Sequence, residues 1–284
     1  MTGTGDEASL VARAAGTFRI HVEFDSRQLT IHTDVRGVRD YVLENFAHMV
    51  VPAVKRPGGD LGVFRTERGY RVTGAESFEY RDTRLETVLP VVKDEVRLQF
   101  IRSRPDLLWL HAAAVERDDG AVLLSGASGQ GKSTISTLLC ERGWRLLSDD
   151  IAPVRMDKDE VVPFPQSPVR RIHPGREVAQ DEVRKLGREM VALGTEMLRR
   201  EPTPIRAIAF IAYDNTEPTG LSRLLPGSAA LELLRNSTNF VDHKSAAVSR
   251  AAGMARSLPM YRLSYRWPVE AAREIDDIPM ATGL

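Results

Sequence analysis

The pattern of apolar and polar positions divides the chain into two parts. In the first hundred residues, alternating residues predict strands and apolar residues at helical spacing predict helices. The predicted elements are strands at 18–24 and 29–33, a helix at 38–49, a hairpin at 62–74 and a helix at 84–104. Pro90 either kinks the last helix or marks its true beginning. Residues 1–104 are therefore predicted to form a small N-terminal α+β domain, and they carry no chemical motif.

The second part, residues 105–284, begins with a strand hairpin and continues as an alternation of strands and helices. Apolar runs at 108–116 and 121–125 flank a turn that ends in Asp-Gly, a strong hairpin signal. The remaining predicted elements are a glycine-rich loop, a helix at 133–142 ended by Gly143, a strand at 144–148, a hairpin turning at 157–159, a strand at 205–213, helices near 228–237 and 245–257, a strand at 261–265 and a polar end. This order predicts an α/β domain.

Composition and charge narrow the class of protein. The chain has 39 basic and 39 acidic residues, so it lacks the positive field that draws proteins to nucleic acid or anionic lipid. No stretch of about 18 apolar residues predicts a membrane span, and the first residues do not resemble a secretory signal. The single cysteine, Cys140, cannot form an internal disulfide and is interpreted as core packing. We expect a cytoplasmic protein, and the sequence is compatible with a homo-oligomer.

The segment Gly126–Ser133 carries the strongest chemical signal. It reads GASGQGKS and matches G-x-x-x-x-G-K-[ST], between a predicted strand and a predicted helix. Its glycines allow successive N–H groups to face one anion. The predicted nucleotide-binding residues are Gly126, Ala127, Ser128, Gly129, Gln130, Gly131, Lys132, Ser133 and Thr134. Lys132 is expected to reach the β- and γ-phosphates of ATP, and Ser133 to ligate Mg²⁺.

Two aspartates follow the next predicted strand. Asp149 and Asp150 come at the end of that strand, after a helix and strand of nearly equal length have returned the chain to the level of the loop. In isolation Ser-Asp-Asp would indicate a solvated turn. Here the carboxyl ends of the two strands are expected on one edge, where such folds bind ligands. One carboxylate could then hold Mg²⁺ while the other accepts a proton from an attacking hydroxyl.

His111 is expected at the mouth of the loop. If the hairpin turns through 117–120, Glu116 pairs with Ala121, and the same register sets His111 opposite Gly126. An imidazole there could orient a carboxylate or bond to a phosphate oxygen. A lone histidine on a strand is more often structural, so the prediction rests on this register.

Taken together, these features resemble the HPr kinase/phosphorylase family, whose catalytic domain is related to phosphoenolpyruvate carboxykinases. The resemblance covers about residues 108–156 and rests on His111, GASGQGKS and ERGWRLLSDD (141–150). It implies an α/β P-loop kinase domain of that type behind a smaller N-terminal α+β domain. It also implies Asp149 as general base, Asp150 as a Mg²⁺ ligand and His111 as support for the base, with ATP and Mg²⁺ as cofactors.

The chain departs from that family after the aspartates. Where the family has a glycine-rich segment that helps it act on phosphoserine, this chain has FPQSPVRRIHPGRE (164–177). Phosphorylase activity and HPr itself are therefore not expected. The basic cluster Arg170, Arg171 and His173 in this segment could hold an anionic group, although such charges more often form a solvated surface.

Three functions remain open from the sequence. The first is transfer of the γ-phosphate of ATP to a hydroxyl, on a serine of a peptide or protein. The second is the same transfer to the hydroxyl of a small metabolite. The third is an ATP-gated regulatory NTPase that is not a kinase, although no subunit-coupling motif such as LSGGQ occurs.

Overall fold

The computed structural model describes residues 11–14, 16–52, 58–172 and 187–279. The chain separates into two compact units, Met1–Pro105 and Asp106–Leu284, both mixtures of strands and helices. Among the described helices, none has the length and apolar character needed to cross a bilayer.

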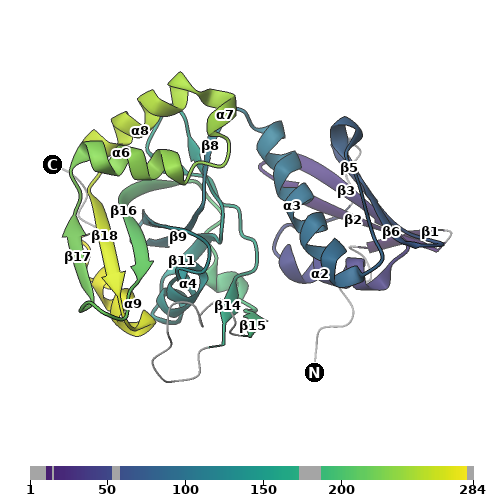
Figure 1. The fold of residues 1–284 in the computed structure, drawn as a ribbon, viewed down its shortest axis with the longest axis horizontal. Helices are drawn as coiled ribbons and strands as arrows, with labels where there is room; N and C mark the ends of the chain where they lie inside the picture. The colour runs from purple at the N-terminus through teal and green to yellow at the C-terminus, as the bar shows by residue number, and fades with distance from the viewer. Residues whose placement is uncertain (1–10, 15, 53–57, 173–186, 280–284) are drawn as a thin grey trace. The chain divides into compact units, whose positions relative to one another are not determined.

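The first unit is a twisted sheet with two helices packed against it (Figure 1). Strand order is β1-β2-β3-β5-β6-β7, with β4 paired to β2. The elements are β1 (Val11–Ala14), β2 (Thr17–Phe24), β3 (Arg27–Thr33), α2 (Arg36–Asn45), β4 (Val50–Val51), β5 (Gly59–Thr66), β6 (Gly69–Thr73), η1 (Ala75–Ser77), β7 (Glu79–Asp82) and α3 (Leu85–Ser103).

The predicted strands and hairpin of this unit are confirmed, while both helix boundaries differ. Helix α2 begins at Arg36 and ends at Asn45, earlier than predicted. Pro90 lies inside α3, so the interpretation that it marks the start of the helix is wrong. The valines at 88, 92 and 96 are fully buried, and this packing outweighs the one backbone hydrogen bond that a proline removes.

The second unit is built around a sheet of order β11-β9-β10-β16-β13-β12-β8, with β18 paired to β16 and β17 to β18. Its elements are β8 (Leu107–Leu110), β9 (Ala112–Arg117), β10 (Gly120–Ser125), α4 (Lys132–Glu141), β11 (Arg145–Ser148), β12 (Ala152–Arg155), β13 (Glu160–Val161), β14 (Val169–Arg171), β15 (Arg188–Met190), η2 (Thr195–Met197), β16 (Thr203–Tyr213), β17 (Gly220–Arg223), α6 (Pro226–Arg235), α7 (Phe240–His243), α8 (Ser245–Ser257), β18 (Met260–Tyr265) and α9 (Pro268–Asp276).

Helices cover both faces of this sheet. Alternate residues of β10 enter two different hydrophobic clusters, because successive side chains of a strand point to opposite faces. One cluster packs against α4 and α9, and the other against α6 and α8 (Figure 1). Cys140 lies in the first, where burial raises the pKa of its thiol to about 12, and this confirms its interpretation as core packing.

The predicted polar end after residue 265 is wrong, because α9 lies there. Three residues of this helix, Ala271, Ala272 and Ile275, are buried against the sheet. Its last residue, Asp276, accepts hydrogen bonds from the Trp144 indole at 2.8 Å and from the guanidinium of Arg142 at 2.6 Å. A short amphipathic helix with small apolar residues gave too weak a pattern to be recognised from the sequence.

We expect Asp276→Asn to lower the free energy of unfolding by about 2–3 kcal/mol, since the substitution removes the charge from hydrogen bonds donated by Arg117, Arg142 and the Trp144 indole. Burial acts to raise the pKa of Asp276, but the Trp144 and Arg142 hydrogen bonds and the charges of Arg117 and Arg142 outweigh it and hold the pKa below its usual range. Because the folded pKa is depressed, this stabilisation is present above about pH 4 and is lost as the pH falls through the folded value.

Urea unfolding of both proteins across a pH series measures this effect. The difference between the two free energies should be constant near neutral pH and should shrink under acid conditions. Asp157→Asn, at an exposed turn position, is the matched control and should leave the free energy unchanged. Equal stability of Asp276→Asn and wild type at pH 7 would contradict the role given to this carboxylate.

Candidate active site

The glycine-rich loop, residues 126–131, joins the end of β10 to the start of α4, in the strand–loop–helix context that the sequence predicts. Gly129 and Gly131 both have left-handed backbone, with φ of 87° and 85°. A Cβ atom at Gly131 would lie 2.0 Å from the Tyr265 hydroxyl oxygen, so no larger residue fits there. Helix α4 therefore begins directly after a tight turn whose N–H groups can face an anion.

Two tyrosines support this loop from the strands beneath it. The Tyr265 hydroxyl at the end of β18 donates to the Gln130 carbonyl oxygen at 2.9 Å, and the Tyr213 N–H at the end of β16 donates to the Gln130 side-chain oxygen at 2.6 Å. Burial raises the pKa of Tyr265 far above its usual value, so its hydroxyl stays a donor. Sequence reasoning missed both tyrosines, because no local pattern connects them to a loop some 80 or more residues away.

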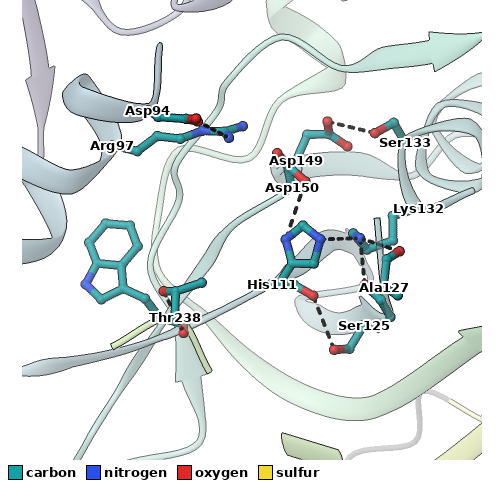
Figure 2. A network of polar contacts seen from close by, with 12 residues as sticks. Asp94, Arg97, His111, Ser125, Ala127, Lys132, Ser133, Asp149, Asp150 and Thr238 are labelled. Atoms are coloured by element: carbon teal, nitrogen blue, oxygen red, sulfur yellow. Dashed lines mark hydrogen bonds and ion pairs between the residues drawn. The ribbon is translucent and has the colours of Figure 1, made fainter. Parts of the chain in front are cut away.

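Lys132, the first residue of α4, is buried and turned back along the loop. Its amine donates to the carbonyl oxygens of Gly126 at 2.7 Å and Ala127 at 3.2 Å, and it lies 2.9 Å from His111 Nε2. An ammonium has only donors, so Nε2 of His111 accepts and the neutral ring carries its proton on Nδ1. Nδ1 in turn lies 3.5 Å from Asp150 Oδ1. Figure 2 shows the resulting row Lys132–His111–Asp150.

His111 lies at a break between two strands. The sequence predicts one strand over 108–116, but β8 pairs with β12 whereas β9 pairs with β10 and β11. The change of partner interrupts the strand at His111, whose N–H donates to the Asn236 carbonyl oxygen at 2.6 Å. The predicted hairpin register is confirmed from the Gly120–Arg117 pair to the Ser125–Ala112 pair. His111 and Gly126 are the next residues in this register and line the same cavity.

The two aspartates point to different partners. Asp149 is buried, and its Oδ2 accepts a hydrogen bond from the Ser133 hydroxyl at 2.9 Å. Asp150 has a φ of 70° and is about one-third exposed, and it faces His111 (Figure 2). Strands β10 and β11 both run antiparallel to β9, so they are parallel to each other and end on the same edge. The left-handed backbone at Asp150 then turns its carboxylate away from that of Asp149.

These residues suit a magnesium nucleotide. Ser133 and Asp149 present hard oxygen donors, which Mg²⁺ prefers, and Mg²⁺ usually takes its other ligands from phosphates and water. In the described ranges, no group of three or more histidine, cysteine or acidic side chains could hold a metal ion. Ala127 and Ser128 are exposed, Gly129 and Gln130 are half-buried, and Thr134 follows in the first turn of α4.

The described residues of the basic cluster predicted at 170–173 lie in different surroundings. Arg170 forms ion pairs with Glu189 at 2.6 Å and Glu141 at 3.5 Å, which ties it to the surface. Arg171 lies beside the loop, since a Cβ atom built on Gly129 would come within 3.1 Å of its Nη2. His173 lies outside the described residues. Of the two described members, Arg171 is the one that lies beside the loop.

Comparison with known proteins gives only distant structural similarity. No protein-family model and no curated protein matches the chain. Among solved structures, the HPr(Ser) kinase/phosphatase from Coxiella burnetii is similar, with a TM-score of 0.28 and 12% sequence identity, over 60% of this chain and 88% of that one. The relationship is structural and remote.

Proposed function

We propose that this protein is a Mg²⁺- and ATP-dependent kinase that transfers a phosphoryl group to a hydroxyl. The observation that carries the proposal is the convergence of two side-chain pairs on one loop. Ser133 with Asp149 and His111 with Asp150 lie on either side of Lys132, at the N-terminus of α4. A glycine-rich loop alone serves motors, switches and kinases equally, whereas a second carboxylate beside the loop supplies the base that a hydroxyl acceptor needs.

In this proposal the loop and Lys132 bind the triphosphate. The N–H groups of residues 127–134 cradle its phosphates, and Lys132 exchanges its carbonyl partners for the β- and γ-phosphate oxygens. Arg171 adds a second positive charge near Gly129. Mg²⁺, when bound, neutralises charge on the phosphates, and Ser133 and Asp149 are the residues that would hold it.

We assign the general base to Asp150, the reverse of the expectation from the sequence resemblance. Asp149 is 3% exposed and already accepts the Ser133 hydroxyl hydrogen bond, which suits a metal ligand. Asp150 is 32% exposed on its side chain and can be reached by an acceptor. In the transfer, the acceptor oxygen bonds to the γ-phosphorus, the bond to the ADP oxygen breaks, and the hydroxyl proton passes to Asp150. His111 is a positioning residue, whose Nδ1–H faces this carboxylate and holds it in place.

Label transfer from γ-labelled ATP tests the proposal. With Mg²⁺ present, the label is expected on a hydroxyl-bearing peptide, protein or metabolite from fractionated cell extract, and chelation of the metal should stop the transfer. Label that appears only as inorganic phosphate, whatever acceptor fraction is added, would instead support a regulatory NTPase.

A further inference from the structure

A cavity of about 520 Å³ borders the loop on the side of His111. Its floor includes the first loop residues, Gly126 and Ala127, whose carbonyl oxygens contact the Lys132 amine. Since this lysine is the one expected to reach the γ-phosphate, the cavity adjoins the reacting end of the proposed nucleotide site. Its volume is within the range of about 300–1,000 Å³ that small-molecule sites occupy.

The charged side chains of this cavity leave a positive excess. Arg235 at the end of α6 and Arg262 on β18 both contact the same Glu232 carboxylate oxygen, each at 3.3 Å. Two guanidinium groups thus share one carboxylate. Arg235 and Arg262 are 72% and 50% exposed, and each guanidinium carries five N–H donors, so most of the donors face solvent or the cavity. Planar guanidinium groups match carboxylate and phosphate oxygens in geometry.

The polar wall between the arginines and His111 is held in place by backbone hydrogen bonds. Asn236 accepts the N–H of His111 at 2.6 Å, and the Thr238 N–H donates to the Trp109 carbonyl oxygen at 2.8 Å. Between them, Ser237 lines the cavity with a buried hydroxyl that has no hydrogen-bond partner within the part of the chain that the structure describes. A buried hydroxyl without a partner is uncommon in folded proteins and is a group that a polar ligand can satisfy.

We propose that this cavity binds the acceptor, and that the acceptor is a small hydroxyl-bearing molecule with an anionic group, either phosphate or carboxylate, held by Arg262 and Arg235. The acceptor's hydroxyl then lies toward His111 and its partner Asp150. The role of this molecule as acceptor rests on the proposed kinase function. The anion site itself rests on the cavity and its charged side chains.

Equilibrium binding to the full chain tests the site separately from catalysis. The loop is first saturated with Mg²⁺ and the non-hydrolysable analogue AMPPNP, so that a second anion cannot bind there. Glycerol 3-phosphate and glycerate, the phosphate and carboxylate probes, are then titrated, with glycerol as the neutral counterpart. We expect at least one anionic probe to bind at millimolar concentration and glycerol not to bind.

Charge variants connect that binding to the arginines. Arg262→Gln is expected to weaken binding of the anionic probe by about tenfold, with a smaller loss for the more exposed Arg235→Gln. Glu232→Gln removes the competing carboxylate and should strengthen binding severalfold, a gain that misfolding cannot imitate. Arg223→Gln, at an exposed position on β17 outside the cavity, is the matched control. Affinity for AMPPNP should be the same in all four variants.

The outcomes separate this proposal from the kinase assignment. Failure of both anionic probes to bind, or equal binding by wild type and Arg262→Gln, would overturn the anion site. Phosphorylation of glycerol or a seryl peptide at the same rate in wild type and Arg262→Gln would overturn the assignment of this cavity to the acceptor while supporting the kinase. Arginine-dependent probe binding without any phosphoryl transfer would support the site and contradict the kinase.

Discussion

Asp150→Asn is expected to lower kcat for phosphoryl transfer by about 100- to 10,000-fold, the range that removal of a general base usually costs. The amide keeps the shape of the side chain but cannot take the proton of the acceptor hydroxyl. The affinity for Mg²⁺-ATP should stay near that of wild type, because Ser133, Lys132 and Asp149 are unchanged. Single-turnover transfer with saturating nucleotide, together with equilibrium nucleotide binding, measures the two effects separately.

The control for this variant is Asp157→Asn, which removes a carboxylate from an exposed turn of the same unit. Its kcat should match wild type. If Asp150→Asn transfers phosphate within a few-fold of the wild-type rate, Asp150 is not the base. Loss of transfer in Asp149→Asn with unchanged Mg²⁺-ATP affinity would then favour the assignment implied by the sequence resemblance.

Asp149→Asn is expected to weaken Mg²⁺-dependent ATP binding by about 10- to 100-fold, the usual effect of losing a carboxylate that ligates a metal or orients its ligands. The Ser133 hydroxyl now donates to this carboxylate at 2.9 Å, and an amide in its place carries no charge to complement the ion. Nucleotide binding measured with Mg²⁺ and with chelator should differ strongly in wild type and little in the variant.

Thermal unfolding provides the control for folding, because Asp149 is buried and its substitution could act on stability. A melting temperature close to wild type without nucleotide, combined with a smaller increase on adding Mg²⁺-ATP, assigns the effect to binding. Unaltered Mg²⁺ dependence in Asp149→Asn would contradict its role at the metal and would leave Ser133 as the ligand to test next.

Local sequence was sufficient for the loop and its flanking elements. The match at Gly126–Ser133, the Asp-Gly turn and Gly143 are all short-range signals, and the hairpin register followed from the turn, which fixes which residues pair. Gly143 has the left-handed φ of 93° expected after the last turn of α4. The strand break at His111 could not be predicted from local sequence, because the change of sheet partner depends on β12, which lies some 40 residues later in the chain.

Tertiary structure alone decided how the site residues are paired. The sequence by itself determined a glycine-rich loop between a strand and a helix, a nearby pair of carboxylates and a histidine at the same edge, because equal lengths of helix and strand return the chain to one level. Which carboxylate meets Ser133 and which meets His111 depends on the left-handed turn at Asp150. Arg235 and Arg262 both contact Glu232. The contact between Arg262 on β18 and Glu232 on α6 joins segments distant in sequence, and it forms only because α6 packs against β18.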